Sequence, residues 1–78
     1  MSNTIIEELY EKNKFVSTEL QALVKRIDPN IVSIGYSFRG TMETEVVTVN
    51  YRNGSARGIT VTGNSLLEIT RSVLYFIA

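Results

Sequence analysis

Cysteine and histidine are both absent from the 78 residues of the chain, which removes the commonest nucleophiles, acid–base groups and zinc ligands. Glu43 and Glu45 lie two residues apart on one face of an expected strand. Paired carboxylates in that position could act as an acid and a base or hold a divalent ion. On a solvated sheet such a pair more commonly keeps the surface soluble. We therefore predict that the protein is not an enzyme, has no metal site and requires no cofactor.

The segment Thr62-Gly63-Asn64-Ser65 is the candidate anion-binding site, because it leads directly into an expected helix. Unpaired N–H groups and the positive end of the dipole at a helix N-terminus attract phosphate or carboxylate groups. With the arginines that could join them, the candidate ligand-binding residues are Arg52, Arg57, Gly63, Asn64, Ser65 and Arg71. The alternative is that Gly-Asn-Ser only turns the chain and caps its own helix.

A long helix over residues 4–27 is the first of the elements that must position these groups. Thr4 and Glu7 have the spacing of a capping box, and Pro29 ends the helix. At 1.5 Å per residue the helix is about 36 Å long and should extend past a strand of about 23 Å. Its apolar stripe consists of Ile6, Leu9, Val16, Leu20, Leu23 and Ile27. Asn13 completes this stripe, either at a half-exposed edge or as a register-setting contact between two helices.

Three strands are expected over residues 31–38, 42–51 and 56–62. Residues 32–38 alternate strictly between apolar and small polar residues, and the second and third runs are separated by the turn residues Arg52-Asn53-Gly54-Ser55. Asn53-Gly54 predicts a two-residue type I′ turn between the second and third strands, since both residues tolerate positive φ. The pairs that follow from this turn are Asn50 with Arg57, Thr48 with Ile59 and Val46 with Val61.

The first hairpin turns near Gly40, and its loop length decides which face of the second strand is buried. A two-residue loop would set Tyr36 beside Glu43 and Glu45, which makes a poor core, so we predict an odd-length loop or a bulge. The expected core face is then Val32, Ile34, Tyr36, Phe38, Met42, Val46, Ile59 and Val61. The other face carries Ser33, Gly35, Ser37, Glu43, Glu45, Val47, Val49, Tyr51, Ala56, Gly58 and Thr60. That face is either a solvated surface or a docking face for a second copy or a partner.

The last helix is expected over residues 65–77, with Ser65 as N-cap and Glu68 at the capping-box position. One apolar stripe, made of Leu66, Ile69, Val73 and Phe76 or Ile77, would pack on the sheet. Leu67, Leu74 and Tyr75 fall outside that stripe and call for a second neighbour. We predict one domain over residues 1–78, an α+β fold of α-β-β-β-α order with a three-stranded antiparallel meander and both helices on one face.

A chain of 78 residues builds only a small core, and without disulfides or metals such domains often gain stability by self-association. We therefore expect a homo-oligomer whose interface uses Asn13, Val47, Val49, Tyr51, Leu67, Leu74 and Tyr75.

Charge and hydropathy exclude several partners. Eight basic residues balance eight acidic ones, and Arg39, Arg52 and Arg57 are too scattered to form a basic stripe for nucleic acid. The N-terminus lacks the pattern of a signal peptide, and the apolar C-terminal run is too short to span a membrane. We expect a cytoplasmic protein that binds neither nucleic acid nor membrane.

The chain resembles short accessory proteins encoded by bacteriophages and prophages. The resemblance rests on the capped α-β-β-β-α layout and on the half of the chain that reads YRNGSARGITVTGNSLLEITRSVLYFIA. The resemblance implies a location in the host cytoplasm and an inhibitor of host machinery or defence systems. It carries over no functional residue. Two hypotheses for a self-associating binding module follow. Its oligomer sequesters a small anionic ligand such as a nucleotide, or it binds and occludes a host protein. A purely structural accessory role is the remaining alternative.

Overall fold

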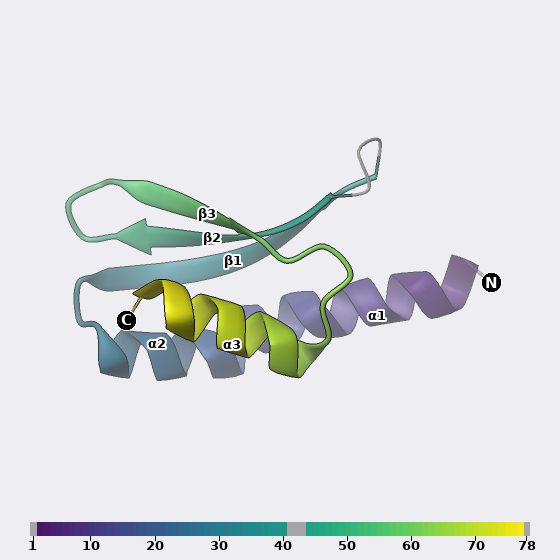
Figure 1. Ribbon diagram of the computed structural model, residues 1–78, viewed down its shortest axis with the longest axis horizontal. Helices are drawn as coiled ribbons and strands as arrows, with labels where there is room; N and C mark the ends of the chain where they lie inside the picture. Colours follow the sequence, from purple (N-terminus) through teal and green to yellow (C-terminus); the bar gives the residue numbers. More distant parts are fainter. Residues whose placement is uncertain (1, 41–43, 78) are drawn as a thin grey trace.

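The computed structural model describes residues 2–40 and 44–77, and in the first range the side chains from residue 7 onward. The elements are α1 (Ser2–Phe15), η1 (Val16–Leu20), α2 (Gln21–Ile27), β1 (Ile31–Arg39), β2 (Thr44–Tyr51), β3 (Ala56–Thr60) and α3 (Leu66–Ile77). The sheet is antiparallel with the order β1-β2-β3. Figure 1 shows the helical segments on one face of this sheet. The α+β fold predicted from the sequence is therefore confirmed.

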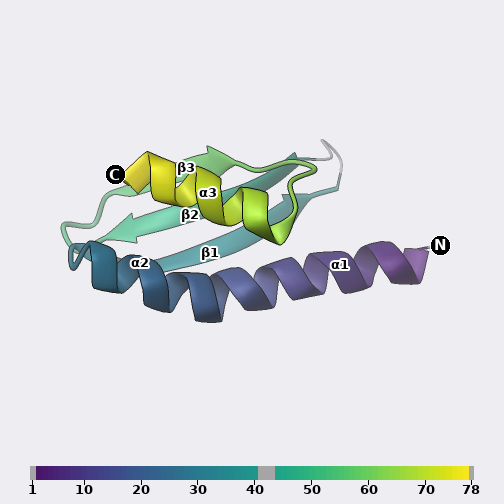
Figure 2. The ribbon, with the colours of Figure 1, turned by 60° about the horizontal axis from the view of Figure 1, so that its bottom comes forward.

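The first three helical segments form one continuous helix, whose N-terminal part extends past the end of the sheet in Figures 1 and 2. The helix begins at Ser2, so Thr4 lies inside its first turn and the prediction that Thr4 is the N-cap is wrong. The helix ends at Ile27, before Asp28 adopts an extended conformation, as expected ahead of Pro29.

A π-helical stretch, η1, interrupts this helix and contains one more residue per turn than an α-helix. The hydroxyls of Ser17 and Thr18 donate hydrogen bonds of 2.8 and 2.6 Å to the carbonyl oxygens of Asn13 and Lys14. Such bonds from a hydroxyl to a carbonyl in the preceding turn compete with the regular helical ladder. The helix therefore changes its register against the sheet at this point.

The extra residue shifts the buried stripe of the helix. Val16, Leu20 and Val24 are fully buried, at spacings of four residues. Leu23 and Ile27, which the unbroken 3-4 pattern predicted to be buried, are 41% and 54% exposed. The prediction for the second half of the stripe was therefore wrong by one residue.

The hairpin between β1 and β2 has an even loop, contrary to the prediction. Arg39 pairs with Thr44, which leaves the four residues 40–43 in the connection. Phe38 consequently pairs with Glu45, and Glu45 lies on the core side of the sheet. Met42, which was expected in the core, and Glu43 lie outside the described residues.

The hairpin between β2 and β3 also differs from the prediction. The Tyr51 N–H donates to the Ser55 carbonyl at 2.9 Å, and the Gly54 N–H donates to the Tyr51 carbonyl at 3.0 Å. These bonds define a three-residue loop, Arg52-Asn53-Gly54, with Gly54 at φ +91°. A type I turn followed by a glycine with positive φ is the usual form of such a loop. Val49 therefore pairs with Arg57, so the expected pairs were wrong by one residue.

Each hairpin register was predicted wrongly by one residue, and side chains alternate between the two faces of a sheet. The buried face of β2 is therefore the opposite of the predicted one, whereas the buried faces of β1 and β3 are largely as predicted. Ile34, Tyr36 and Val61 are buried as predicted, and Ile59 packs against them. Val47 and Val49 are fully buried in place of Val46, which lies half-buried on the open face. Val32 is 48% exposed because the pairing shifts at a bulge between Ile31 and Ser33, and Phe38 is 41% exposed.

The last helix, α3, begins with the predicted reciprocal cap. The Ser65 N–H donates to the Glu68 carboxylate at 2.8 Å, and the Glu68 N–H donates to the Ser65 hydroxyl at 3.2 Å. Ile69 and Val73 are fully buried against the sheet. No helix in the described ranges has the length and apolar character needed to cross a membrane.

Candidate functional site

Glu45 is a buried carboxylate that contacts three other segments. Its Oε1 lies 2.7 Å from Lys12 Nζ and accepts a 2.6 Å hydrogen bond from the Tyr36 hydroxyl. Its Oε2 accepts a 2.8 Å hydrogen bond from the Gly63 N–H. Glu45 is 6% exposed, so the prediction that it lies on a solvated face was wrong.

The hydrogen bonds around Glu45 also set its protonation. Burial would raise the pKa of the Glu45 carboxyl, but the bonds from Lys12, Tyr36 and Gly63 outweigh burial and hold that pKa below its ordinary value. The pKa of the Tyr36 hydroxyl is raised well above its usual range by burial, by this hydrogen bond and by the negative charge of Glu45. A carboxylate with three donors is a weak base, and this cluster is best understood as a structural link between α1, the sheet and the β3–α3 connection.

The segment predicted to bind an anion uses its N–H groups within the chain. Gly63 donates to Glu45, Asn64 donates to the Val61 carbonyl at 3.0 Å, and Ser65 donates to Glu68. Four charged side chains line the adjacent surface depression, three of them acidic (Glu8, Glu11 and Glu68) and one basic (Lys12). The reciprocal bonds between Ser65 and Glu68 match the capping alternative, and the N–H groups of residues 63–65 all have partners within the chain.

The predicted arginines are divided between the two ends of α3. Arg71 is exposed and lines a surface depression with Asn64 and Glu68, near the predicted turn. Arg52 and Arg57 lie at the opposite end of α3, beside the β2–β3 turn. Arg52 and Arg57 instead line a cavity of about 610 Å³, which we call the turn-end pocket. Its lining residues are Asp28, Asn30, Tyr51, Arg52, Asn53, Ser55, Arg57 and Phe76.

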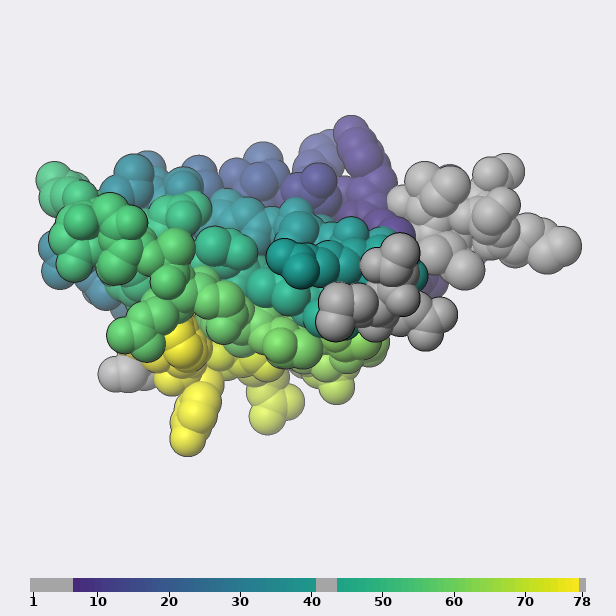
Figure 3. Space-filling view, turned by 90° about the horizontal axis from the view of Figure 1, so that it is seen from above, coloured from purple at the N-terminus to yellow at the C-terminus, as the bar shows by residue number. Residues whose placement is uncertain are grey.

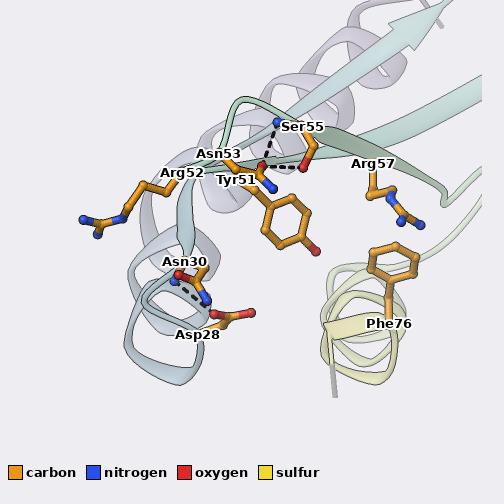
Figure 4. A pocket seen from close by; sticks show the side chains of 8 residues that line it. All are labelled: Asp28, Asn30, Tyr51, Arg52, Asn53, Ser55, Arg57 and Phe76. Atoms are coloured by element: carbon orange, nitrogen blue, oxygen red, sulfur yellow. Dashed lines mark hydrogen bonds between the residues drawn. The ribbon is translucent and has the colours of Figure 1, made fainter.

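The frame of the turn-end pocket is fixed by hydrogen bonds between the α2–β1 turn and the β2–β3 turn. The Arg52 N–H donates to the Asn30 carbonyl at 2.7 Å, and Arg52 Nη2 donates to the Pro29 carbonyl at 3.1 Å. Asn53 Oδ1 accepts bonds from the Ser55 N–H at 2.9 Å and from the Ser55 hydroxyl at 2.7 Å. In Figure 4 the Arg52 side chain points away from the other lining residues, so its role is in the frame.

Four side chains face the interior of the pocket in Figure 4. Arg57 from β3 and Phe76 from α3 point toward each other, and the Tyr51 hydroxyl points toward the same space. Asp28 accepts the Asn30 N–H at 3.0 Å through Oδ1, and its other oxygen points into the pocket. The Arg57 guanidinium has no ion-pair or hydrogen-bond partner among the residues that the structure describes. The pocket thus combines one unpaired cation, one carboxylate and two aromatic rings.

Sequence reasoning found Arg52 and Arg57 but placed Asp28, Tyr51 and Phe76 elsewhere. Asp28 was interpreted only as part of the helix stop, and Phe76 only as part of a core stripe. The two turn signals, Asp-Pro-Asn and Arg-Asn-Gly-Ser, mark both rims of the pocket. Nothing in either signal indicates that the two turns lie side by side.

The expected interface residues have different positions in the fold. Val47 and Val49 are fully buried in the core of the single chain, so that part of the interface prediction is wrong. Tyr51 lines the turn-end pocket, and Leu74 is half-buried against the core. The remaining three, Asn13, Leu67 and Tyr75, are exposed, and their role in an interface stays a prediction.

Within residues 2–40 and 44–77, no cluster of three acidic side chains is close enough to hold a metal ion. Comparison of the chain with protein-family models, with curated proteins and with solved structures found no match. The function therefore has to be inferred from the site.

Proposed function

We propose that the protein is a non-enzymatic binding module whose turn-end pocket takes a small anionic ligand, with a nucleotide as the best-fitting class. The observation that carries the proposal is the unpaired Arg57 guanidinium on the wall of this pocket, next to the Phe76 ring. An arginine without a partner at the wall of a cavity favours a phosphate or carboxylate, because its planar donors match both groups.

The size and chemistry of the pocket fit a nucleotide. About 610 Å³ lies within the range of ordinary small-molecule sites. A phosphate would bind Arg57, while the flat base would pack against Tyr51 or Phe76 by stacking. The carboxylate of Asp28, on the other side of the pocket, can accept hydrogen bonds from exocyclic amino groups of the base.

The chemistry of the rim supports binding over catalysis. Ser55 is the serine that lines the pocket, and its hydroxyl donates to the side-chain amide oxygen of Asn53. An amide oxygen does not take up a proton at neutral pH, so this pair lacks the base that activates a serine nucleophile. A module of this kind acts by removing its ligand from solution.

Isothermal titration calorimetry tests the proposal with AMP, GMP, their cyclic forms and inorganic phosphate. We expect at least one nucleotide to bind, and we expect Arg57→Ala to weaken that binding about 10- to 100-fold because charge-assisted hydrogen bonds are lost. Arg71→Ala is the matched control, since Arg71 is exposed on α3 and does not line the pocket.

Absence of heat across the whole panel would contradict the nucleotide class. Equal binding by the Arg57→Ala and Arg71→Ala variants would contradict the location of the site.

A further inference from the structure

The two edges of the sheet differ in how they are protected. At the β1 edge, the Gln21 side chain accepts a 3.1 Å hydrogen bond from the Ile34 N–H. A bulge between Ile31 and Ser33 also distorts this edge, and the long helix lies along it in Figure 2. Covering groups and bulges are the devices by which proteins prevent strand edges from pairing with other chains. The β1 edge is therefore partly covered, at Ile34 and at the bulge.

The β3 edge carries none of these devices among the described residues. Ser55 and Val61, which flank β3, bond to Tyr51 and Glu45 of β2, and these two bonds set the alternation of the ladder between them. Because the pattern alternates, the N–H and C=O groups of Ala56, Gly58 and Thr60 point away from β2. No bond from the described chain meets these outward groups. Ala56 and Thr60 carry small, uncharged, exposed side chains and Gly58 carries none, so no side chain of these three residues blocks an approaching strand.

One flank of α3 is uncovered on the same side of the molecule. In Figure 3, which looks down on the open face of the sheet, side chains of α3 (yellow) project beyond β3 (green). Tyr75 is 88% exposed and Phe76 is 40% exposed, and Phe76 lies next to Arg57 of β3. An aromatic side chain with this exposure on a small soluble domain is a candidate interface residue.

We propose that β3 pairs antiparallel with β3 of a second copy of this chain, around a two-fold axis at Gly58, to form a continuous six-stranded sheet. In this register Ala56 lies opposite the partner's Thr60. Arg57 lies beside the partner's Ile59, so that no like charges are opposed. The same axis brings the exposed flank of α3 against α3 of the partner, with the helices antiparallel.

The need for buried area favours a second copy over a short peptide. A stable interface buries about 800 Å² per partner, and the whole chain exposes 5412 Å². A strand of five residues, about 17 Å long, is too short to bury that much. A second copy supplies both a strand of matching length and the exposed Tyr75 and Phe76 side chains of α3, because a two-fold axis places the same surface on both sides. The dimer does not require a ligand in the turn-end pocket, although Arg57 and Phe76 line that pocket and also lie at this side of the molecule.

Disulfide trapping tests the register of the two β3 strands. Because the sequence contains no cysteine, an introduced cysteine can cross-link only to its copy in the second chain. In a Gly58→Cys variant the two cysteines would face each other across the axis at about 5.5 Å between Cα atoms, within the range of a disulfide. An added Cβ at this position would meet Val46 at an ordinary contact distance of 3.5 Å, so the variant should fold. Under mild oxidation we expect a covalent species of twice the 8.8 kDa chain mass.

Ala22→Cys, on the exposed face of α2, is the matched control for trapping. Cross-linking of the Gly58→Cys variant no faster than of this control would overturn the register.

Light scattering tests the edge itself. We expect the unaltered chain to be a dimer, and the double variant Ala56→Lys with Thr60→Lys to be a monomer with an unchanged circular dichroism spectrum. Ser37→Lys adds a charge on β1, which is the far edge of the sheet, and should leave the dimer intact. A monomeric unaltered chain, or a double variant that remains dimeric, would overturn the proposal.

Discussion

At the scale of single residues, Glu45 connects three segments through one carboxylate. Lys12 reaches it from α1, Tyr36 from β1 and the Gly63 N–H from the connection into α3. A buried charge is tolerated only when its hydrogen-bonding capacity is used, and here both oxygens have partners. The same carboxylate makes the fold sensitive to acid.

The pH dependence of stability follows from the direction of the Glu45 shift. The pKa of this carboxyl is lower in the folded than in the unfolded chain, so its contribution is complete above its ordinary value of 4.5. That contribution should be lost as the pH falls from about 5 through the lowered folded pKa. Urea titrations at pH 7, 5 and 3 would measure it as a falling free energy of unfolding.

Glu45→Gln is the matched variant for this pH series. Its amide nitrogen would place a donor against Lys12 or the Gly63 N–H, so we expect a loss of about 2 kcal/mol at pH 7. The variant should then lose less stability than the unaltered chain between pH 5 and pH 3. Parallel pH profiles for the two proteins would mean that Glu45 is not the group responsible.

At the scale of elements, α3 depends on a cap that the sequence already contained. Ser65 and Glu68 satisfy each other's backbone N–H groups, and the exposed Glu68 carboxyl has a lowered pKa because of its bonds to Ser65. Replacing an N-cap serine by alanine removes one of these bonds.

We expect Ser65→Ala to destabilise the protein by about 1 kcal/mol in chemical denaturation. Ser72→Ala makes the same change inside α3, where alanine favours the helix, and should be close to neutral. Equal losses in the two variants would show that the cap contributes nothing.

The long helix shows how an element departs from its sequence pattern. Its apolar residues follow an unbroken 3-4 spacing, yet η1 inserts one residue and directs Val24 rather than Leu23 into the core. Leu23 and Ile27 are left exposed as a result. The sequence carries a hint of this stretch in Ser17 and Thr18, whose hydroxyls bond to preceding carbonyls.

At the scale of the whole molecule, the chain is elongated, with extents of 40 × 22 × 17 Å. In the part of the chain that the structure describes, three strands and two helices enclose a small core, and the outward backbone groups at the β3 edge have no partner. A second copy on that edge would add buried surface that the single chain lacks. Unfolding coupled to dissociation depends on protein concentration.

We expect the melting temperature to rise by about 3 °C or more for each tenfold increase in concentration. Differential scanning calorimetry over a hundredfold range would measure this rise. In the double variant Ala56→Lys with Thr60→Lys, the melting temperature should not change with concentration. A constant melting temperature for the unaltered chain would count against the dimer.

The strand β2 shows most clearly which features could be predicted from the sequence and which could not. Its run of β-branched residues predicted a strand, but Val46 and Val47 lie on opposite faces, so either face fits the core when the two flanking loops are uncertain by one residue. The Asn53-Gly54 signal predicted a turn at the right place and the wrong length, because Gly54 serves a three-residue loop as well as a type I′ turn. The first loop was predicted to have an odd length because an even length would bury Glu45. The sequence does not show that Lys12, Tyr36 and Gly63 are the partners that make this burial possible.

The sequence by itself determined the kinds and order of the elements, because capping residues, turn residues and hydrophobic periodicity are local properties. It also determined the cap of α3 and the end of α2 before Pro29. Only the tertiary structure decided which face of β2 is buried, which strand edge is open and that Asp28, Tyr51, Arg57 and Phe76 share a pocket. Those features depend on loop lengths counted to the single residue and on contacts between segments far apart in the chain, neither of which a local pattern specifies.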